Sequence, residues 1–330
     1  MSYKHILQIL NTCIFQPMRQ NKSMDALSKI FDDIHLNKSE YLYLKARGDW
    51  CFHYEDQSAM VAYAIVSGHA LIQLDATTQV HVRTGDLVLI PSGRSHSASN
   101  TPSPLVDTLN ITHRFDETGE KSIEFGAGEG KQTVILAIRC HMDSIMARPL
   151  LNALPQSIHL HQMNGQTIPE WLQIGLQFLA VETLQVQPGR DKILDHLVSI
   201  FFIECVRDYI LQLSDSNNWL SALSHPELSN ALAAIHGQPQ HAWTVETLAE
   251  QCCMSRSKFA QLFSQMVGEP PLAYLQQHRL RIASQYLRQG QYTVQQIAHL
   301  VGYASETAFS QTFKKQFDLT PSQYRQQFMQ

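Results

Sequence analysis

The sequence predicts an α+β protein of several domains, with an N-terminal β-barrel, a helical linker and an all-α C-terminal domain that contains two helix-turn-helix units. Three observations predict this class. Residues 49–145 contain short apolar runs separated by turn residues, at the spacing of a barrel or sandwich. Residues 168–235 show helical periodicity, and residues 244–274 are repeated at 293–324. With 330 residues, the chain is long enough for two separate cores.

The first 23 residues show no core-like pattern and are interpreted as an N-terminal extension, residues 1–23. The apolar run at 6–15 is interrupted by polar residues and lacks a small-residue cleavage site, so we expect no signal peptide. No stretch reaches the ~18 apolar residues that a membrane span needs. The cysteines show no CxxC spacing, which is typical of reduced thiols. We therefore expect a cytoplasmic, nucleoid-associated protein with no membrane partner.

Runs of β-branched and other apolar residues predict the strands of the barrel. Turns are predicted at Gly85-Asp86 and at Pro91-Ser92-Gly93, where glycine and proline interrupt the pattern. The predicted strands cover residues 60–66, 70–74, 79–82, 87–90, 105–111 and 133–140.

Cys140 ends the last of these strands, between Arg139 and His141. Neighbouring cations would lower the pKa of a thiol and favour the thiolate, so Cys140 is a candidate redox sensor. The alternative is a buried thiol that fills a small core position, which is the usual environment of a free cysteine.

Two amphipathic helices are predicted over residues 169–186 and 190–213, separated by Pro188-Gly189. In the second helix, the apolar run 197–203 extends around the helix. A helix of this kind should be buried against the barrel or against another subunit. A weaker helix is predicted over residues 226–236.

The repeat aligns with an offset of 49 that becomes 50 from Ser255 onward, so Ala304 is a one-residue insertion. Each copy predicts a helix, a tight turn and a second helix. Apolar residues at i, i+3, i+4 and i+7 mark the buried faces. Thr244 and Thr293 are N-cap candidates for the first helices, as Ser255 and Ser305 are for the second ones.

Removal of these apolar stripes leaves a compact polar face on each second helix. Short polar and cationic side chains near a helix N-terminus suit base edges and phosphates in a major groove. The alternative is a pair of helical hairpins in an ordinary bundle, but the same face is polar in both copies. These faces consist of Arg256, Ser257, Ala260, Gln261 and Ser264 in the first copy, and of Glu306, Thr307, Ser310, Gln311 and Lys314 in the second.

A helix over residues 272–289, ended by Gly290, separates the two copies. At ~1.5 Å per residue it spans roughly 27 Å, so it can hold two recognition helices about one DNA turn (~34 Å) apart. Residues 237–330 carry eight Lys/Arg against five Asp/Glu, a net of +3, and the rest carries 17 against 24, a net of −7, which gives −4 in total. A mildly basic end on an acidic body suits a DNA-binding domain joined to another domain.

The C-terminal hundred residues resemble the AraC/XylS family of bacterial transcription regulators. The resemblance rests on TVETLAEQCCMSRSKFAQLFSQMVGEPPLAYL and IAHLVGYASETAFSQTFKKQFDLTPSQYR. It implies binding to double-stranded promoter DNA and, in an activator, contact with RNA polymerase. At the position of Gln311 the family usually has Arg, and at the position of Asp318 it often has Gly. Without this Arg, we expect the second unit to lack one strong contact with a base or a phosphate. The implied DNA-binding residues are Arg256, Ser257, Lys258, Ala260, Gln261, Ser305, Glu306, Thr307, Ser310, Gln311 and Lys314.

Residues 85–100, GDLVLIPSGRSHSASN, resemble the second motif of the cupin barrel. With MDALSKIF, RCHMDSIMARPLLNALPQSIHL and WLSALSHPELSNALAAIHGQPQHAWTV, the chain resembles the cupin-containing branch of the same regulators over nearly all of residues 24–330. This resemblance implies a cupin-like sensor domain at 24–165, a helical dimerisation region at 166–225 and a double helix-turn-helix domain at 226–330.

Enzymatic cupins bind a metal through histidines and a glutamate of the first motif and a histidine of the second. Here His96 takes the second-motif position, whereas the first motif offers His53, Glu55 and Asp56 without an HxH pair. A metal site could be formed by His53, Glu55 and His96. The alternative is that His96 caps a barrel strand in a metal-free core, and we expect no cofactor.

Two hypotheses of function follow. The first is a homodimeric transcription regulator, an activator or a repressor and not an enzyme, whose cupin-like domain senses a small-molecule effector or an oxidative or electrophilic signal. The second is a metal-dependent cupin enzyme with a DNA-binding tail. The first is preferred because a regulator needs no turnover, and a stoichiometric transition metal would favour the second.

Overall fold

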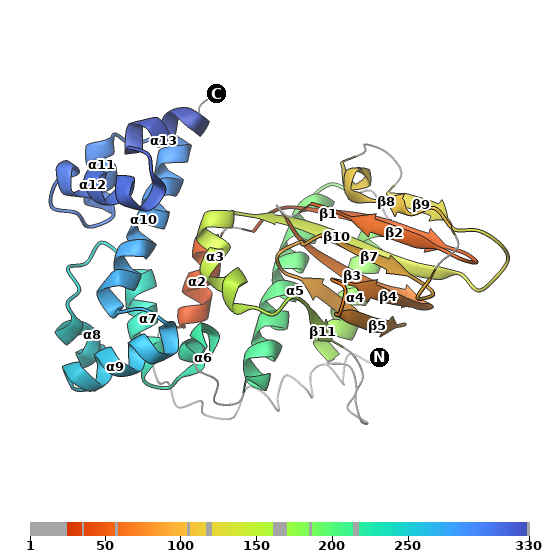
Figure 1. Cartoon of the computed structure of the whole chain (residues 1–330), viewed down its shortest axis with the longest axis horizontal. Coiled ribbons are helices and arrows are strands. Elements are labelled where there is room, and N and C mark those ends of the chain that lie inside the picture. Colours follow the sequence, from red (N-terminus) through yellow and green to blue (C-terminus); the bar gives the residue numbers. More distant parts are fainter. Residues whose placement is uncertain are drawn as a thin grey trace.

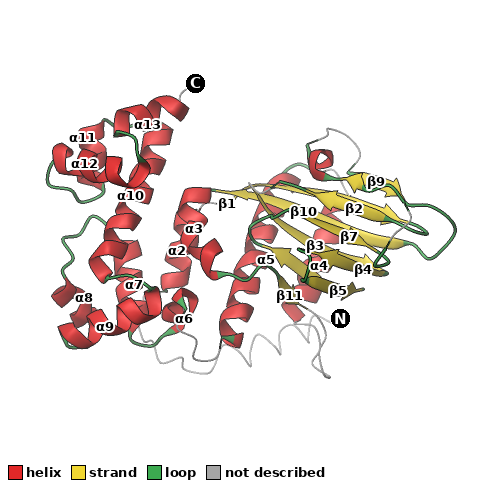
Figure 2. Ribbon diagram, in the orientation of Figure 1, coloured by secondary structure: helices red, strands yellow, loops and turns green. Residues whose placement is uncertain are grey.

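A computed structural model (Figure 1) describes residues 25–34, 36–56, 59–103, 106–116, 121–160, 170–184, 187–213 and 218–328. The predicted extension at 1–23 lies outside the described residues, as do parts of the predicted strand 105–111 and helix 169–186. The described part forms a β-rich lobe and a helical lobe, which Figure 2 distinguishes by colour. The predicted α+β class is therefore confirmed.

The β-rich lobe is built from two sheets. One has the strand order β11-β6-β3-β10-β1-β9 and the other the order β5-β4-β7-β2-β8. Most neighbours pair antiparallel, while β1 pairs with β9 and β2 with β8 in parallel. The bounds are β1 Leu36–Ala46, β2 Cys51–Tyr54, β3 Ala59–Ser67, β4 His69–Gln73, β5 Gln79–Arg83, β6 Leu87–Ile90, β7 His96–Ser99, β8 Leu109–Asn110, β9 Ser122–Phe125, β10 Thr133–Met142 and β11 Ile158–Leu160.

The predicted strands 60–66, 70–74, 79–82, 87–90 and 133–140 are confirmed as β3, β4, β5, β6 and β10. The predicted strand 105–111 is reduced to β8. The sequence analysis missed β1, β2, β7, β9 and β11. In β1, Glu40 and Lys45 interrupt the apolar pattern, although Leu42, Leu44 and Ala46 face the interior of the barrel.

The interior between the sheets is a packed aromatic core. Trp50, Phe52, Tyr54, Tyr63 and Phe115 are at most 1% exposed, and their rings contact one another edge-on or stacked. These large side chains pack at the density typical of protein interiors and fill the described space around them between the sheets.

The outer face of the six-stranded sheet is covered by helices (Figures 1 and 2). Phe201, Phe202 and Cys205 on one of them lie over Met60 and Ala62 of β3. The prediction that residues 197–203 are buried is therefore confirmed for the side of this helix that faces the barrel. The helices of this lobe are α2 Ala26–Ile34, α3 Ser144–Ala153, α4 Glu170–Leu184 and α5 Arg190–Gln212, with the 3-10 helix η1 Thr112–Phe115.

The helical lobe is organised along one long helix, α10, with a helix-turn-helix unit at each end (Figure 1). Gly290 ends α10 with φ 70°, as its predicted role as a C-terminal cap requires. The helices are α6 Trp219–Ser224, α7 Leu228–Gly237, α8 Val245–Gln251, α9 Arg256–Val267, α10 Pro271–Gln289, α11 Val294–Leu300, α12 Glu306–Phe317 and α13 Pro321–Phe328.

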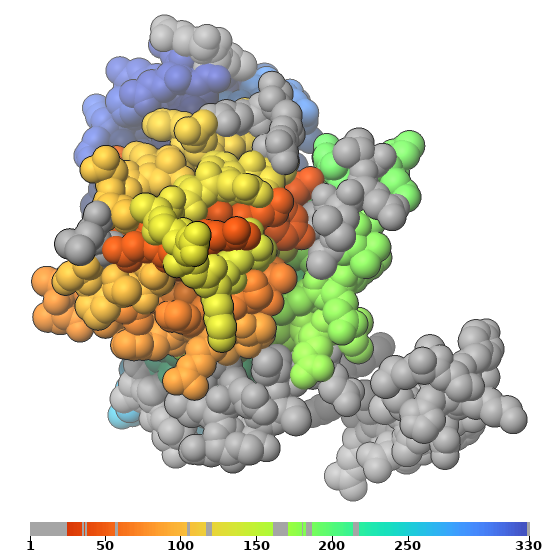
Figure 3. Space-filling view, turned by 90° about the vertical axis from the view of Figure 1, so that its right-hand side faces the viewer, coloured from red at the N-terminus to blue at the C-terminus, as the bar shows by residue number. Residues whose placement is uncertain are grey.

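The two units differ in how they join the rest of the protein. One continuous hydrophobic core runs from the outer face of the barrel through α2, α6 and α7 to Phe259 and Phe263 of the first unit. The second unit has its own core around Phe309 and Phe313. Figure 3 views the molecule from the barrel end, with α4 in green at the side and the second unit in blue behind. Among the described residues, no helix is long and apolar enough to span a membrane.

Candidate nucleic-acid interface

The first unit consists of α8 and α9, and both helices have the predicted N-caps. The hydroxyl of Thr244 accepts a hydrogen bond from the amide of Thr247 (3.2 Å), and the Thr247 hydroxyl accepts one from the Thr244 amide (2.9 Å). The Ser255 hydroxyl accepts from the amide of Lys258 (3.4 Å). In the turn, Cys253 has φ 52°, a left-handed conformation that is uncommon outside glycine. These bonds fix where the exposed helix α9 begins.

The second unit repeats this arrangement with α11 and α12. Thr293 and Gln296 form a capping box, and the Ser305 hydroxyl accepts from the amide of Ala308 (3.2 Å). Gly302 in the turn has φ 84°, and a Cβ there would lie 2.6 Å from the carbonyl oxygen of Gln240. Glycine is the residue that adopts this left-handed backbone without a steric cost.

The predicted recognition residues lie together on the outer faces of α9 and α12. Phe259 and Phe263 bury the inner face of α9, as Phe309 and Phe313 do for α12. Each outer face therefore begins at a capped N-terminus, where backbone amides and short side chains can approach a phosphate or a base edge. Ala260 and Ser310 are half-buried, and the exposed residues are Arg256, Ser257, Lys258, Gln261, Ser305, Glu306, Thr307, Gln311 and Lys314.

The barrel does not assemble the three metal candidates of the sequence analysis. Tyr54 pairs with His96 across β2 and β7, so the preceding residue, His53, points to the opposite face of the sheet. There it forms an ion pair with Glu55, with 2.9 Å between Nε2 and Oε1. A ligand set of His53, Glu55 and His96 is thus wrong, because the face alternation of a strand separates the two histidines.

His96 is held in the aromatic core by both ring nitrogens. Its Nδ1–H donates to the carbonyl oxygen of Arg94 (2.6 Å), which leaves Nε2 to accept from the hydroxyl of Tyr63 (2.8 Å). Burial lowers the pKa of His96 to about 4. The imidazole is therefore neutral and has no free nitrogen for a metal in this conformation.

The expected reactive thiolate at Cys140 is not found. The side chain is 1% exposed and faces α5, and burial raises the pKa of its thiol to about 11. Arg139 points to the other face of β10, where it donates to Glu40 (2.7 Å), so it does not stabilise a thiolate at Cys140. The predicted pKa decrease was wrong because neighbours along a strand face opposite sides. The sensor role of Cys140 stays a prediction, and it requires that the contact between Cys140 and α5 opens.

Comparisons with known proteins agree with this arrangement. A family model described as a cupin matches residues 25–211, and one described as a helix-turn-helix domain matches residues 248–327. The HTH-type transcriptional regulator AlkR of Acinetobacter baylyi is 59% identical over 306 residues, which are 92% of this chain and 100% of that protein. The chain belongs to the AraC family of transcriptional regulators. Its predicted membership in the cupin-containing branch is confirmed.

Other relatives of this AraC-family regulator include the RCS-specific HTH-type transcriptional activator RclR of Escherichia coli. It is 31% identical over 268 residues, which are 81% of this chain and 84% of that protein. The crystal structure of the DNA-binding domain of AdpA in complex with a target DNA is 30% identical, covers 31% of this chain and 92% of that chain, and has a TM-score of 0.30.

The net positive charge of the DNA-binding lobe overstates the number of cations available to phosphates. Arg279 donates to the carbonyl oxygens of Pro239 (2.6 Å) and His241 (2.7 Å) and so secures the segment before α8. The other structural arginines are Arg281, largely buried beside Tyr274; Arg288, paired with Asp143; and Arg325, bonded to the Tyr292 carbonyl. Of the eight Lys/Arg in 237–330, the exposed cations are Arg256, Lys258, Lys314 and Lys315.

Two carboxylates near α9 were missed by the sequence analysis. Glu246 contacts Arg256, with 2.8 Å between Oε1 and Nε, and Glu227 lies 3.6 Å from Nζ of Lys258. These exposed pairs are weak and readily exchanged for phosphate contacts. The position of Glu246 ahead of the turn can be read from the sequence. Its pairing with Arg256 depends on the angle between α8 and α9, which the sequence does not give.

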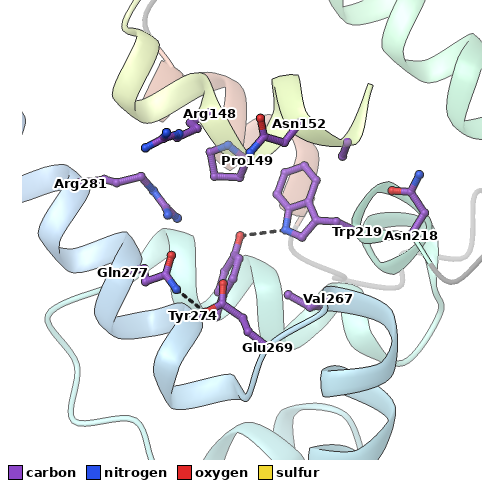
Figure 4. Close-up of a pocket in the computed structure, with 11 residues that line it drawn as sticks. Arg148, Pro149, Asn152, Asn218, Trp219, Val267, Glu269, Tyr274, Gln277 and Arg281 are labelled. Atoms are coloured by element: carbon purple, nitrogen blue, oxygen red, sulfur yellow. Dashed lines mark hydrogen bonds between the residues drawn. The ribbon is translucent and has the colours of Figure 1, made fainter. Parts of the chain in front are cut away.

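A cavity of about 410 Å³ lies between the two lobes (Figure 4). The wall on the barrel side comes from Arg148, Pro149 and Asn152 of α3, and the opposite wall from the helical lobe. Trp219 donates through Nε1 to the Tyr274 hydroxyl (3.2 Å) at its centre. The volume falls in the usual range for small-molecule sites, about 300–1,000 Å³. The residues of the helical lobe that line it are Asn218, Trp219, Val267, Glu269, Tyr274, Gln277 and Arg281.

Proposed function

We propose that this AraC-family regulator binds promoter DNA as a homodimer, with α9 and α12 of each chain in two successive major grooves. The observation that carries the proposal is the rigid spacer α10. Its 19 residues span ~28 Å, close to the ~34 Å turn of DNA that separates successive major grooves. Each recognition helix starts at a capped N-terminus and shows its polar face to solvent.

Within this proposal the exposed side chains divide by chemistry. Gln261 and Gln311 carry amides that suit an adenine edge, and Arg256 suits a guanine edge. Lys258 and Lys314 are point charges that suit phosphates. Ala260 suits contact with a thymine methyl, and Glu306 disfavours phosphate near the start of α12. The small hydroxyl-bearing residues Ser257, Ser305, Thr307 and Ser310 suit either bases or phosphates.

The homodimer is supported by an apolar stripe on α4. Ile174, Phe178 and Val181 are each about half exposed or more and follow the i, i+4, i+7 spacing of one helix face. A contiguous apolar stripe on a helix that already covers the barrel marks a protein interface. We assign residues 24–165 to sensing, 166–225 to dimerisation and 226–330 to DNA binding. Helix α6, at the end of the dimerisation segment, packs against α7 and α9 of the DNA-binding segment.

The signal is proposed to be a small molecule bound in the cavity between α3 and α10. The aromatic filling of the barrel favours this place over the barrel interior. A ligand that contacts both walls would favour one arrangement of the two lobes over another. RclR is named an activator, and activation by this regulator in the cytoplasm would require contact with RNA polymerase.

The proposal is tested by selection of bound duplexes from a random pool with the full chain. The expected consensus contains two half-sites whose centres lie about 10 base pairs apart for each chain. A folded, dimeric protein that enriches no duplex, or enriches only a single half-site per chain, would contradict the two-groove arrangement.

A further inference from the structure

Three metal-ligating side chains meet at the contact between the barrel lobe and the helical lobe. Asp33 comes from α2, His236 from the end of α7 and His278 from the middle of α10. Their ligand-type atoms all lie within 4.8 Å of one another, and no other such group of three occurs among the described residues. Because the residues are far apart in sequence, no motif announces this cluster.

His236 is oriented by partners on both sides of its ring. Its Nδ1 lies 2.7 Å from Oδ2 of Asp33, and its Nε2 lies 2.8 Å from the hydroxyl of Tyr274. Trp219 donates to the same hydroxyl, which in turn donates to Nε2, so Nδ1 carries the proton and faces the carboxylate. A ring held from behind by an outer partner is typical of metal-binding histidines.

His278 leaves one nitrogen without a partner. Its side chain is 1% exposed, and its Nε2 makes no hydrogen bond within the described structure. This nitrogen lies 3.7 Å from Oδ2 of Asp33, and the ring centroid lies 4.1 Å from that of His236. A buried polar atom without a partner costs about 1–3 kcal/mol, so its presence in a packed interface calls for an explanation.

We propose that Asp33 Oδ2, His236 Nδ1 and His278 Nε2 bind one divalent transition metal ion of the zinc class. Two imidazoles and one carboxylate are a ligand set that Zn²⁺, Co²⁺, Ni²⁺ and Fe²⁺ accept. With bonds of ~2.0–2.2 Å, neighbouring ligand atoms lie about 3.0–3.5 Å apart. The observed 2.7 and 3.7 Å bracket this spacing, so small side-chain rotations are sufficient.

The surroundings also suit an ion of this kind. Burial lowers the pKa of both histidines, which keeps them in the neutral form that donates to a metal. Asp33 is 23% exposed, so solvent reaches the carboxylate and a water molecule can complete the coordination. On metal binding the proton of the neutral ring would move from His236 Nδ1 to Nε2, so that Nδ1 could bind the ion and Nε2 would donate to the Tyr274 hydroxyl.

One neighbour opposes the ion. The guanidinium of Arg281 lines the same small cavity as Asp33, His236 and His278, and its Nη2 is buried without a hydrogen bond. Its positive charge repels a dication across a short distance. Arg281 therefore weakens metal binding at this site. Removal of its charge should tighten metal binding, an effect that a purely structural hydrogen-bond cluster would not show.

The test uses the full chain, treated with a chelator and titrated with Zn²⁺ by calorimetry and with Co²⁺ by absorption spectroscopy. We expect one ion per chain and a Co²⁺ spectrum with nitrogen ligands. Asp33→Asn and His278→Gln should each weaken Zn²⁺ binding by more than the roughly 10- to 100-fold typical of an outer partner. Arg281→Gln should tighten it roughly tenfold or more. His53→Gln, at a surface histidine paired with Glu55, is the control and should leave it unchanged.

Absence of saturable binding by the wild type would overturn the proposal, as would equal affinities in the wild type, Asp33→Asn and His278→Gln. Circular dichroism confirms folding of each variant. If one variant fails to fold, the other variant and the wild-type Co²⁺ spectrum decide. Selection of a preferred duplex is measured separately, so a failure of the metal site and a failure of the proposed DNA binding are distinguishable.

Discussion

At the scale of single residues, the side chains on α9 and α12 differ in what they contribute to DNA binding. An amide that reads a base edge affects one position of the operator, whereas an ammonium group near a phosphate affects all sequences alike. With four exposed cations per chain, the logarithm of affinity should fall with the logarithm of salt concentration with a slope of about −3 to −4 per chain.

We expect Gln261→Ala to cost about 1–3 kcal/mol for the preferred duplex and to relax specificity at one base pair. Lys314→Ala should weaken all duplexes similarly and reduce the salt slope by about 0.9 per chain. Binding measured over a series of salt concentrations, with single-base variants of the selected duplex, separates the two effects. The same pattern for both substitutions would show that the assigned roles are wrong.

His96 gives the barrel a defined sensitivity to acid. Its pKa in the folded state is lowered to about 4, below the ordinary value of 6.5, so the folded state prefers the neutral ring. The stabilisation is complete above pH 6.5 and is lost as the pH falls toward 4, by about 3 kcal/mol in total. Urea unfolding between pH 7 and 4 should show this loss in the wild type but not in His96→Gln. An equal pH dependence in both would exclude His96 as the cause.

At the scale of elements, two left-handed glycines of the helix-turn-helix units should tolerate a Cβ differently: Gly302 in the turn of the second unit and Gly268 at the C-terminal end of α9. Gly302→Ala adds a methyl group 2.6 Å from a backbone carbonyl at φ 84°, whereas Gly268→Ala, at φ 87°, meets nothing within 4 Å. We expect a loss of about 1 kcal/mol for Gly268→Ala, from the backbone alone. Gly302→Ala should cost about 3 kcal/mol or more. Thermal unfolding measures the loss of stability in each variant. Equal losses would mean that the segment around Gln240 moves to accommodate the methyl group.

The helix-turn-helix elements were predictable because their determinants are local. Thr244, Ser255, Thr293 and Ser305 bond to amides three residues away, and Gly290 ends its own helix. The barrel was less predictable, since β1 takes its place from its pairing with β10, about a hundred residues along the chain. At the candidate interface, the exposed face of α9 followed from periodicity, but the use of Arg279 as a clamp on backbone carbonyls did not.

At the scale of the whole molecule, the stripe on α4 offers a test of dimerisation. Phe178→Asp places a charge in the centre of the proposed interface and should yield monomers at micromolar concentration, with weaker binding of the selected duplex. Val66→Asp is the matched control, because Val66 on β3 is 49% exposed, close to the 48% of Phe178, and lies outside residues 166–225. Light scattering measures the mass of each variant. A Phe178→Asp dimer that persists would place the subunit contact elsewhere.

The core that passes from the barrel through α2, α6 and α7 into the first DNA-binding unit has a consequence for how such regulators diversify. A chimera that exchanges sensor domains at the segment before α8 would cut the contacts that α8 and α9 make with α7 and α6, through which this core reaches α2 of the barrel lobe. A regulator that combines a new signal with a new operator must therefore acquire matched changes on both sides of this shared core. The second unit has a core of its own, which meets the barrel lobe through Ile145 of α3, so its base preferences can change with fewer adjustments in the sensor.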